Sequence, residues 1–343
     1  MMTLNGSAGR SHAEHAALNH GYGAVMGALV GDAAGAVLEF LGRPPREDEV
    51  EHALTLPGGG CWGVAPGQLT DDGELTLCLL NALPPGVGYD ADRVAAAYVA
   101  WYGSRPFDVG GTTAAALGAF VPGPDNFATN AAAILARAAR DNSYASKANG
   151  SLMRASPIGV WGHALGADVI ASAARQDSAL THPNPSCADA VAAYAIAIAA
   201  LIRTSGDRMA AFVDSQAWAA SSATQEVQEW LTLAKSGARI PFYPQAGFVK
   251  IAFVHAFRHL VAGSGLVEAL RETLLGGGDT DTNACIVGGL IGAADGIAGV
   301  PSAMAEAVLC CDTREGRPRP EFLHPRDIRA RVESLVCGAR RTT

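Results

Sequence analysis

The chain has 343 residues, of which 49% are hydrophobic and 17% are charged, and its formal net charge is −8. This composition supports a large buried core and excludes a chain that is disordered throughout. The acidic balance and the lack of a basic stripe disfavour a nucleic-acid backbone or an anionic membrane as the partner, and we expect neither.

The N-terminus and the cysteines both predict a cytoplasmic protein. Residues 1–20 are polar and lack the apolar centre of a signal peptide, so we expect a disordered N-terminal tail there. The seven cysteines are odd in number and include no C-x-x-C pair, which indicates reduced thiols. The longest apolar run, 191–202, is shorter than the roughly 20 residues that span a bilayer, so it predicts a buried helix.

The pattern from residue 21 onward predicts helices and no strands. Over 21–40, Gly27, Gly31 and Gly35 recur every fourth residue and form a smooth stripe that lets a neighbouring backbone pack closely. Residues 43–67 are rich in proline, glycine and charge and predict a long loop, a kind of segment that is often functional. Because no alternating strand pattern or repeat follows, we predict one all-α domain over residues 21–340. Further helices are predicted over 72–82, 91–102, 113–120, 130–140, 151–161, 166–180, 186–203, 207–220, 223–235, 246–262, 265–274, 281–298, 302–310 and 325–337.

An acidic cluster, Thr70-Asp71-Asp72, precedes the apolar helix predicted at 72–82. One interpretation is a helix cap, because threonine and aspartate favour the N-cap and acidic side chains favour the first turn. The other is a set of oxygen ligands for a cation. This cluster alone does not decide between the two.

A second acidic cluster, Asp279-Thr280-Asp281-Thr282, follows three glycines and also precedes an apolar helix. Three glycines and two alternating aspartates exceed what a cap requires, because glycine permits unusual backbone angles and close approach. Carboxylates this close repel one another unless a cation lies between them. If the two clusters meet in the fold, their carboxylates and hydroxyls suit two Mg²⁺ or Mn²⁺ ions better than zinc and could activate a water.

A third acidic pair, Asp32 and Glu39, lies seven residues apart on the first predicted helix and therefore on one face of it. Glu39 lies at the expected end of that helix, beside the long loop. It is a candidate metal ligand or general base. The alternative is an ordinary solvated carboxylate.

Six segments of the chain, in this order, resemble the ADP-ribosylglycohydrolases: Gly27–Glu39, Thr70–Asp72, Asp108–Thr112, Asn149–Gly159, Thr181–His182 and Gly277–Asn283. The resemblance implies an all-α fold around a binuclear metal centre. It implies hydrolysis, by a metal-activated water, of the glycosidic bond between ADP-ribose and a protein side chain, with arginine favoured. A hydrolase of serine-linked or small-molecule ADP-ribose conjugates, or a catalytically silent ADP-ribose-binding protein, is the alternative.

The resemblance also implies roles for individual residues. The catalytic residues would be Glu39 and Asp281, and the metal ligands would be Thr70, Asp71, Asp72, Asp279, Asp281 and Thr282. The substrate-binding residues would be Asp32, Asp108, Gly110, Gly150, Ser151, Met153 and His182. The two glycines could expose backbone N–H groups to a pyrophosphate, and Ser151 could add a hydroxyl at a predicted helix start.

Three of these positions have a competing interpretation. Met153 and His182 could belong to the core rather than to a ligand site. Arg154, beside them, could anchor a phosphate or pair with a site carboxylate. Gly73 stands where the family often has threonine, so a hydroxyl at the rim of the metal site is missing.

Overall fold

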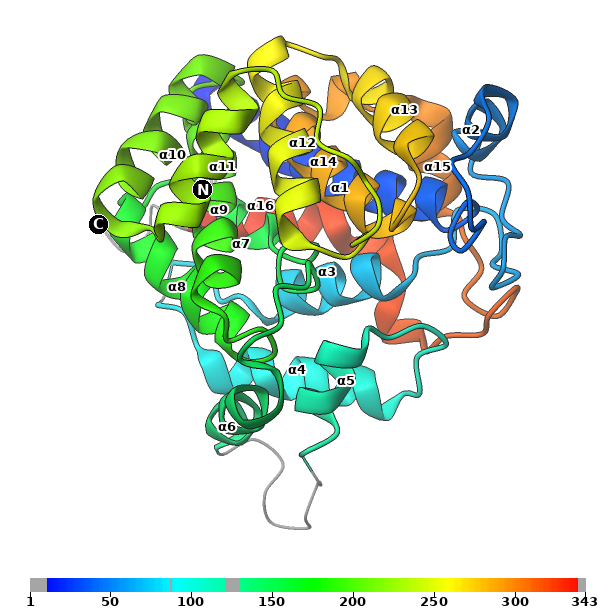
Figure 1. Ribbon diagram of the computed structural model, residues 1–343, viewed down its shortest axis with the longest axis horizontal. Helices are drawn as coiled ribbons and strands as arrows, with labels where there is room; N and C mark the ends of the chain where they lie inside the picture. Colours follow the sequence, from blue (N-terminus) through cyan, green and yellow to red (C-terminus); the bar gives the residue numbers. More distant parts are fainter. Residues whose placement is uncertain (1–10, 87, 121–129, 339–343) are drawn as a thin grey trace, which may run out of the picture.

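The computed structural model describes residues 11–86, 88–120 and 130–338, and within these ranges the chain forms sixteen α-helices and no β-strand (Figure 1). This architecture confirms the predicted all-α fold class. The helices are α1 (His12–Gly35), α2 (Glu47–Ala53), α3 (Asp71–Ala82), α4 (Ala91–Gly103), α5 (Gly111–Leu117), α6 (Ala131–Ser143), α7 (Ser156–Gly162), α8 (Ala167–Ala179), α9 (Pro185–Arg203), α10 (Arg208–Ser222), α11 (Gln225–Lys235), α12 (Val249–Ala262), α13 (Leu266–Gly276), α14 (Thr280–Asp295), α15 (Ser302–Leu309) and α16 (Ile328–Gly338).

Helices α1 and α14 lie side by side through the middle of the molecule, drawn in blue and orange in Figure 1. The glycine stripe of α1 faces α14, as predicted. A β-carbon on Gly31 would lie 2.2 Å from the carbonyl oxygen of Ala284, and one on Gly35 would lie 2.3 Å from the Cα of Asp281. The two backbones are in direct contact, and this contact brings the C-terminal end of α1 against the N-terminal end of α14.

Helix α9 is the buried helix that the long apolar run predicts. Every residue from 189 to 202 is buried, and α9 packs against α7, α8 and α10. By length and composition α9 could cross a membrane, but 89% of its apolar window is buried inside the protein. It therefore serves as a core helix around which the outer helices pack.

The start of α1 differs from the prediction. The helix begins at His12 rather than Gly21, because Ser11 and Glu14 form a capping box in which each side chain accepts a hydrogen bond from the other residue's backbone N–H. The prediction of a disordered tail is therefore wrong for 11–20. Residues 1–10 of that expected tail lie outside the described residues.

Three further boundaries differ from the prediction. Helix α1 ends at Gly35, so Glu39 lies in the turn beyond it and does not share a helical face with Asp32. The short helix α2 lies inside the segment that was expected to be a loop. Helix α7 begins at Ser156, so Ser151 belongs to a turn rather than to a helix start.

Candidate functional site

The C-terminal end of α1 and the N-terminal ends of α3 and α14 meet beneath a cleft, and they carry most of the predicted acidic site residues. Thr70 is the N-cap of α3, which places Asp71 and Asp72 in the first turn of that helix. Asp279 is the N-cap of α14 and Asp281 lies in its first turn. The glycines at 277 and 278 both have positive φ, which lets the chain turn sharply into α14. Acidic side chains at helix N-termini are favoured by the helix dipole.

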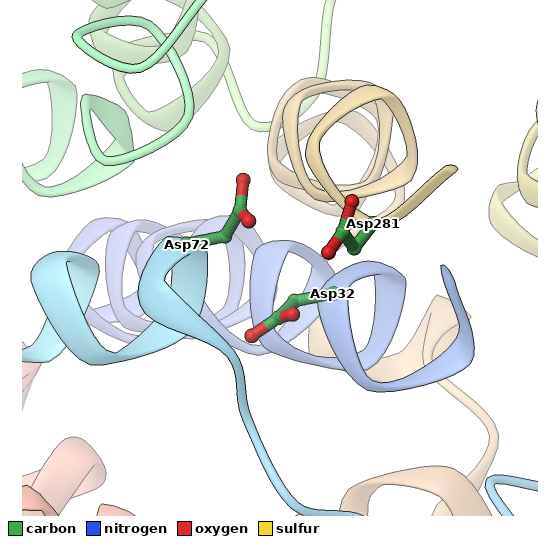
Figure 2. Close-up of side chains that lie close together, drawn as sticks. All are labelled: Asp32, Asp72 and Asp281. Atoms are coloured by element: carbon green, nitrogen blue, oxygen red, sulfur yellow. The ribbon is translucent and has the colours of Figure 1, made fainter. Parts of the chain in front are cut away.

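Two groups of three carboxylates are built at this point, and they share one member. Asp32, Asp72 and Asp281 place one oxygen each within 4.8 Å of one another, and all three are buried. Figure 2 shows these side chains coming from α1, α3 and α14. Glu39 and Asp108 form the second group with Asp281, within the same limit. The expected convergence of the two acidic clusters is therefore confirmed.

The carboxylate of Asp32 is held by the chain that leads into α3. The Thr70 hydroxyl donates to Asp32 Oδ1 at 2.6 Å, and the Gly73 N–H donates to Oδ2 at 2.9 Å. A β-carbon at Gly73 would lie 2.4 Å from Asp32 Oδ2, so a threonine does not fit there while Asp32 holds this position. Glycine at position 73 is thus matched to how this chain orients Asp32.

One carboxylate oxygen in the group lacks a partner. Asp72 Oδ2 lies 3.2 Å from the Thr70 hydroxyl, but Asp72 Oδ1 is buried and has no hydrogen-bond partner among the described residues. A buried polar atom without a partner is costly, and a buried charge more so. A donor set made only of oxygens, with one oxygen left over, fits a hard divalent cation.

Burial and mutual repulsion disfavour the charged form of these carboxylates. Burial, opposed by hydrogen bonds from Thr70 and Gly73, raises the pKa of Asp32 to about 7. Burial, followed by the charges of neighbouring aspartates, raises the pKa of Asp72 and of Asp281 well above the usual range. The cluster therefore retains protons near neutral pH unless a cation replaces them.

Above the carboxylates lies a cleft of about 610 Å³. Its lining includes the following predicted site residues: Glu39, Asp71, Asp108, Gly110, Gly150, Met153, His182, Asp279, Asp281 and Thr282. The predicted metal-site residues Thr70 and Asp72 are fully buried and outside this lining. Most of the predicted residues thus share one cleft, and these two support it from below.

Two residues expected to contact substrate do not line the cleft. Asp32 is fully buried and faces Thr70 and the other carboxylates. Ser151 is fully buried, and its hydroxyl accepts a hydrogen bond from the Ser178 hydroxyl at 3.0 Å. Both side chains are therefore buried beside residues that line the cleft and do not reach its surface.

Gly110 and Gly150, expected near a pyrophosphate, and His182, expected at the substrate, all line the cleft, but each is already engaged by a neighbouring residue. The Gly110 N–H donates to Asp71 Oδ2 at 3.2 Å, so it is already engaged. Gly150 lies against His182, because a β-carbon there would be 2.8 Å from the imidazole Cε1. Burial, with the nearby Arg154 charge, lowers the pKa of His182 to about 3, so this imidazole is neutral.

Arg154 pairs with neither a phosphate site nor a cleft carboxylate. Its Nε lies 3.0 Å from Asp177 Oδ2, and both side chains are fully buried. A second bond joins Arg154 Nη2 to the Asp177 carbonyl at 3.0 Å. The arginine therefore braces the turn at 150–154 against α8.

Trp62 contacts the cleft residue Glu39 from behind the cleft lining, and the sequence did not indicate it. Its indole N–H donates to Glu39 Oε2 at 2.5 Å, and its ring packs edge-on against Phe40 and tilted against Phe107. Burial, followed by the Asp108 charge, raises the pKa of Glu39 to about 7, and the bond from Trp62 opposes this rise. The sequence signal that could have indicated Trp62 is that it is the one tryptophan in the segment 43–67, which was expected to be a functional loop.

Comparison with known proteins gives one consistent result. A family model described as ADP-ribosylglycohydrolase matches residues 13–327. A putative ADP-ribosyl glycohydrolase of Acanthamoeba polyphaga mimivirus is 29% identical over 313 residues, which cover 85% of this chain and 91% of that protein. A solved structure described as an ADP-ribosylglycohydrolase-related protein complex superposes with a TM-score of 0.70 at 22% identity, covering 96% of this chain and 99% of the other, and shows the shared fold.

Two bacterial relatives match over shorter stretches. An ADP-ribosylarginine hydrolase of Pseudomonas putida is 38% identical over 108 residues, 29% of this chain and 28% of that protein. An ADP-ribosyl-dinitrogen reductase glycohydrolase of Rhodospirillum rubrum is 37% identical over 90 residues, 26% of this chain and 31% of that protein. The matched stretches span less than a third of either relative.

Proposed function

The chain belongs to the ADP-ribosylglycohydrolase family, and we propose that it is a metal-dependent hydrolase that cleaves the bond between ADP-ribose and an arginine side chain of a protein. The observation that carries this proposal is the pair of carboxylate groups that share Asp281 at the base of one cleft. The cleft volume lies within the range usual for small-molecule sites.

Two divalent cations, Mg²⁺ or Mn²⁺, are part of the proposal. The protein ligands would come from Thr70, Asp71, Asp72, Asp279, Asp281 and Thr282, with Asp32 beside them. When bound, such cations would lower the pKa of a water and neutralise charge in the cleft. The unpartnered Asp72 Oδ1 and the raised pKa values of the aspartates support a cation at this place.

The chain's own residues supply the remaining chemistry. Glu39, which lines the cleft and accepts a hydrogen bond from Trp62, would take a proton from the attacking water. The surrounding aspartates offset the positive charge that develops on the ribose ring. The neutral imidazole of His182 would offer the substrate a hydrogen bond rather than a positive charge.

The acidic residues that line the cleft favour a cationic leaving group. Glu39, Asp108 and Asp279 all line the cleft, and a guanidinium would be attracted to them. The Pseudomonas putida relative is named for ADP-ribosylarginine hydrolysis, which supports the same choice at partial coverage. The proposed partners are therefore proteins ADP-ribosylated on arginine.

The test is incubation of the purified protein with arginine-, serine- and glutamate-linked ADP-ribosylated proteins, with and without chelator. Release of ADP-ribose from the arginine-linked protein, lost on chelation and restored by Mn²⁺ or Mg²⁺, is the expected result. Release that is insensitive to chelation would refute the metal proposal. Tight binding of ADP-ribose by titration calorimetry without any release would identify a silent binding protein.

A further inference from the structure

A buried ion pair outside the cleft joins the C-terminal part of the chain to α3. Arg319 and Glu74 have side chains that are each 4% exposed, and the pair is bidentate, with Nε to Oε1 at 2.7 Å and Nη2 to Oε2 at 2.9 Å. The Trp101 indole donates a third hydrogen bond, to Glu74 Oε2 at 2.6 Å. Both oxygens of Glu74 are therefore fixed, two residues after Asp72.

The same guanidinium also holds the end of α4. Arg319 Nη1 donates to the carbonyl oxygens of Ser104 and Arg105 at 3.2 and 3.1 Å, and Nη2 donates to the Ser104 hydroxyl at 2.8 Å. With the two bonds to Glu74, all five guanidinium N–H donors are used. Arg105 has a left-handed φ of 59°, and Asp108 follows three residues later. Arg319 thus caps α4 where the chain turns toward the cleft.

A second contact ties the same segment, residues 312–319, to the other side of the acidic cluster. The Arg317 N–H donates to Gln68 Oε1 at 3.0 Å, and the Gln68 side-chain amide donates to the Arg317 carbonyl. The segment 312–319 therefore binds Gln68, which lies two residues before Thr70, and Glu74, which lies two residues after Asp72.

We propose that Arg319 is a positioning residue of the site, which sets the distance between Asp72 and Asp108 and thereby the affinity for divalent cations. Asp72 belongs to one carboxylate group and Asp108 to the other. The Arg319 side chain contacts the chain segments that lead to both. The inference rests on the proposed function, because it concerns the spacing of the proposed cation ligands. Groups that hydrogen-bond directly to metal ligands tune metal affinity by about 10–100-fold. Arg319 acts on the ligands through Glu74, Ser104 and Arg105, so we expect an effect at the lower end of that range.

The test replaces the ion pair by apolar side chains of similar volume. Arg319→Met alone leaves Glu74 buried without its partner and is expected to destabilise the fold. Adding Glu74→Leu removes that buried charge, and exchanges of a whole buried pair are often neutral for stability. The control is Arg258→Met with Glu272→Leu, a more exposed ion pair of 2.6 Å between α12 and α13 that does not line the cleft.

The readouts are the dissociation constant for Mn²⁺, measured by electron paramagnetic resonance on chelator-treated protein, and the melting temperature. We expect the double variant at 74 and 319 to fold but to melt below the wild type, because the Trp101 indole N–H and the Ser104 and Arg105 carbonyls lose their partners. It should bind Mn²⁺ about 10-fold more weakly, while the control pair binds as the wild type does. An unchanged dissociation constant in that double variant would show that the pair is only structural and would overturn the inference.

A second variant covers the case in which the double replacement does not fold. Arg319→Lys keeps a cation beside Glu74 but cannot reach Ser104 and Arg105 as well, so weaker Mn²⁺ binding is again expected and wild-type binding would overturn the inference. Failure of the wild type itself to bind Mn²⁺ would overturn the proposed function, and this inference with it. Variants that bind Mn²⁺ like the wild type overturn only this inference, whereas a wild type that does not bind Mn²⁺ overturns the proposed function, so the two results are distinguishable.

Discussion

Gly27 in α1 and Gly288 in α14 meet backbone to backbone. A β-carbon at Gly27 would lie 2.2 Å from the Gly288 carbonyl oxygen, and one at Gly288 would lie 2.1 Å from the Gly27 carbonyl oxygen. Because Asp32 and Asp281 project from these two helices, the same contact determines how far apart their carboxylates lie.

We predict that Gly27→Ala destabilises the protein by about 3 kcal/mol, at the upper end of the usual cost of overpacking, because α1 and α14 must move apart. Gly103→Ala is the matched control, since nothing lies within 4 Å of a β-carbon at that helical position. The control should be neutral or slightly stabilising. Denaturant unfolding measures both, and equal stability of the two variants would contradict the prediction.

We predict opposite effects of Asp72→Asn on activity and on stability. Turnover should fall more than about 100-fold, beyond the usual effect of an outer-shell change, because a proposed ligand is lost. The metal-free protein should become more stable at pH 7.5, because folding forces Asp72, whose pKa is raised by burial, either to bury a charge or to take up a proton, and asparagine does neither. Asp214→Asn is the control, because the Asp214 side chain in α10 is half-exposed and pairs with Arg203 at the surface. A variant with normal turnover would refute the assignment of Asp72.

The effect of Mn²⁺ on stability should depend on pH. In the metal-free chain the pKa of Asp32 is raised to about 7, so its contribution to stability is present below about pH 4 and is lost as the pH rises through about 7. Mn²⁺ competes with the retained protons, so it should bind and stabilise more strongly at pH 8 than at pH 5.5. At 100 times its dissociation constant it should add about 2.7 kcal/mol. Thermal melts at both pH values test this, and an effect of equal size at the two would count against it.

Trp62→Phe should impair the proposed proton transfer without weakening Mn²⁺ binding. The replacement keeps an aromatic ring between Phe40 and Phe107 but removes the hydrogen bond to Glu39. Because that bond favours the charged carboxylate, its loss should raise the pKa of Glu39 and move the acid limb of kcat/KM to higher pH. Trp230→Phe, packed against Phe248 and Phe253, is the control. An unchanged pH profile would argue against Glu39 as the base.

Local patterns predicted most of the helices and singled out acidic residues that the fold brings close together. The apolar runs and glycines placed α3, α9 and α14 within a few residues, because periodicity and helix termini are local properties. The start of α1 was also available locally, in the capping box of Ser11 and Glu14. The prediction missed it because the polar N-terminus suggested a tail.

The partners of the site residues could not be predicted from local patterns. Glu74 and Arg319 are 245 residues apart, and nothing near either one indicates the other. Arg154 was expected at the cleft, but Asp177 in α8 binds it in the core. The orientation of Asp32 depends on the chain entering α3, a tertiary contact that the spacing between Asp32 and Glu39 does not contain.

The contact between α1 and α14 also determines which positions around the cleft tolerate substitution and which do not. The acidic base of the cleft cannot be widened by small substitutions between α1 and α14, because their backbones are in direct contact and no side chain lies between them. The rim has that freedom: Phe40 is 71% exposed and Leu41 is 39% exposed, and both border the cleft from the turn after α1. Engineering toward a different acceptor should therefore diversify these rim positions and leave the helix pair untouched.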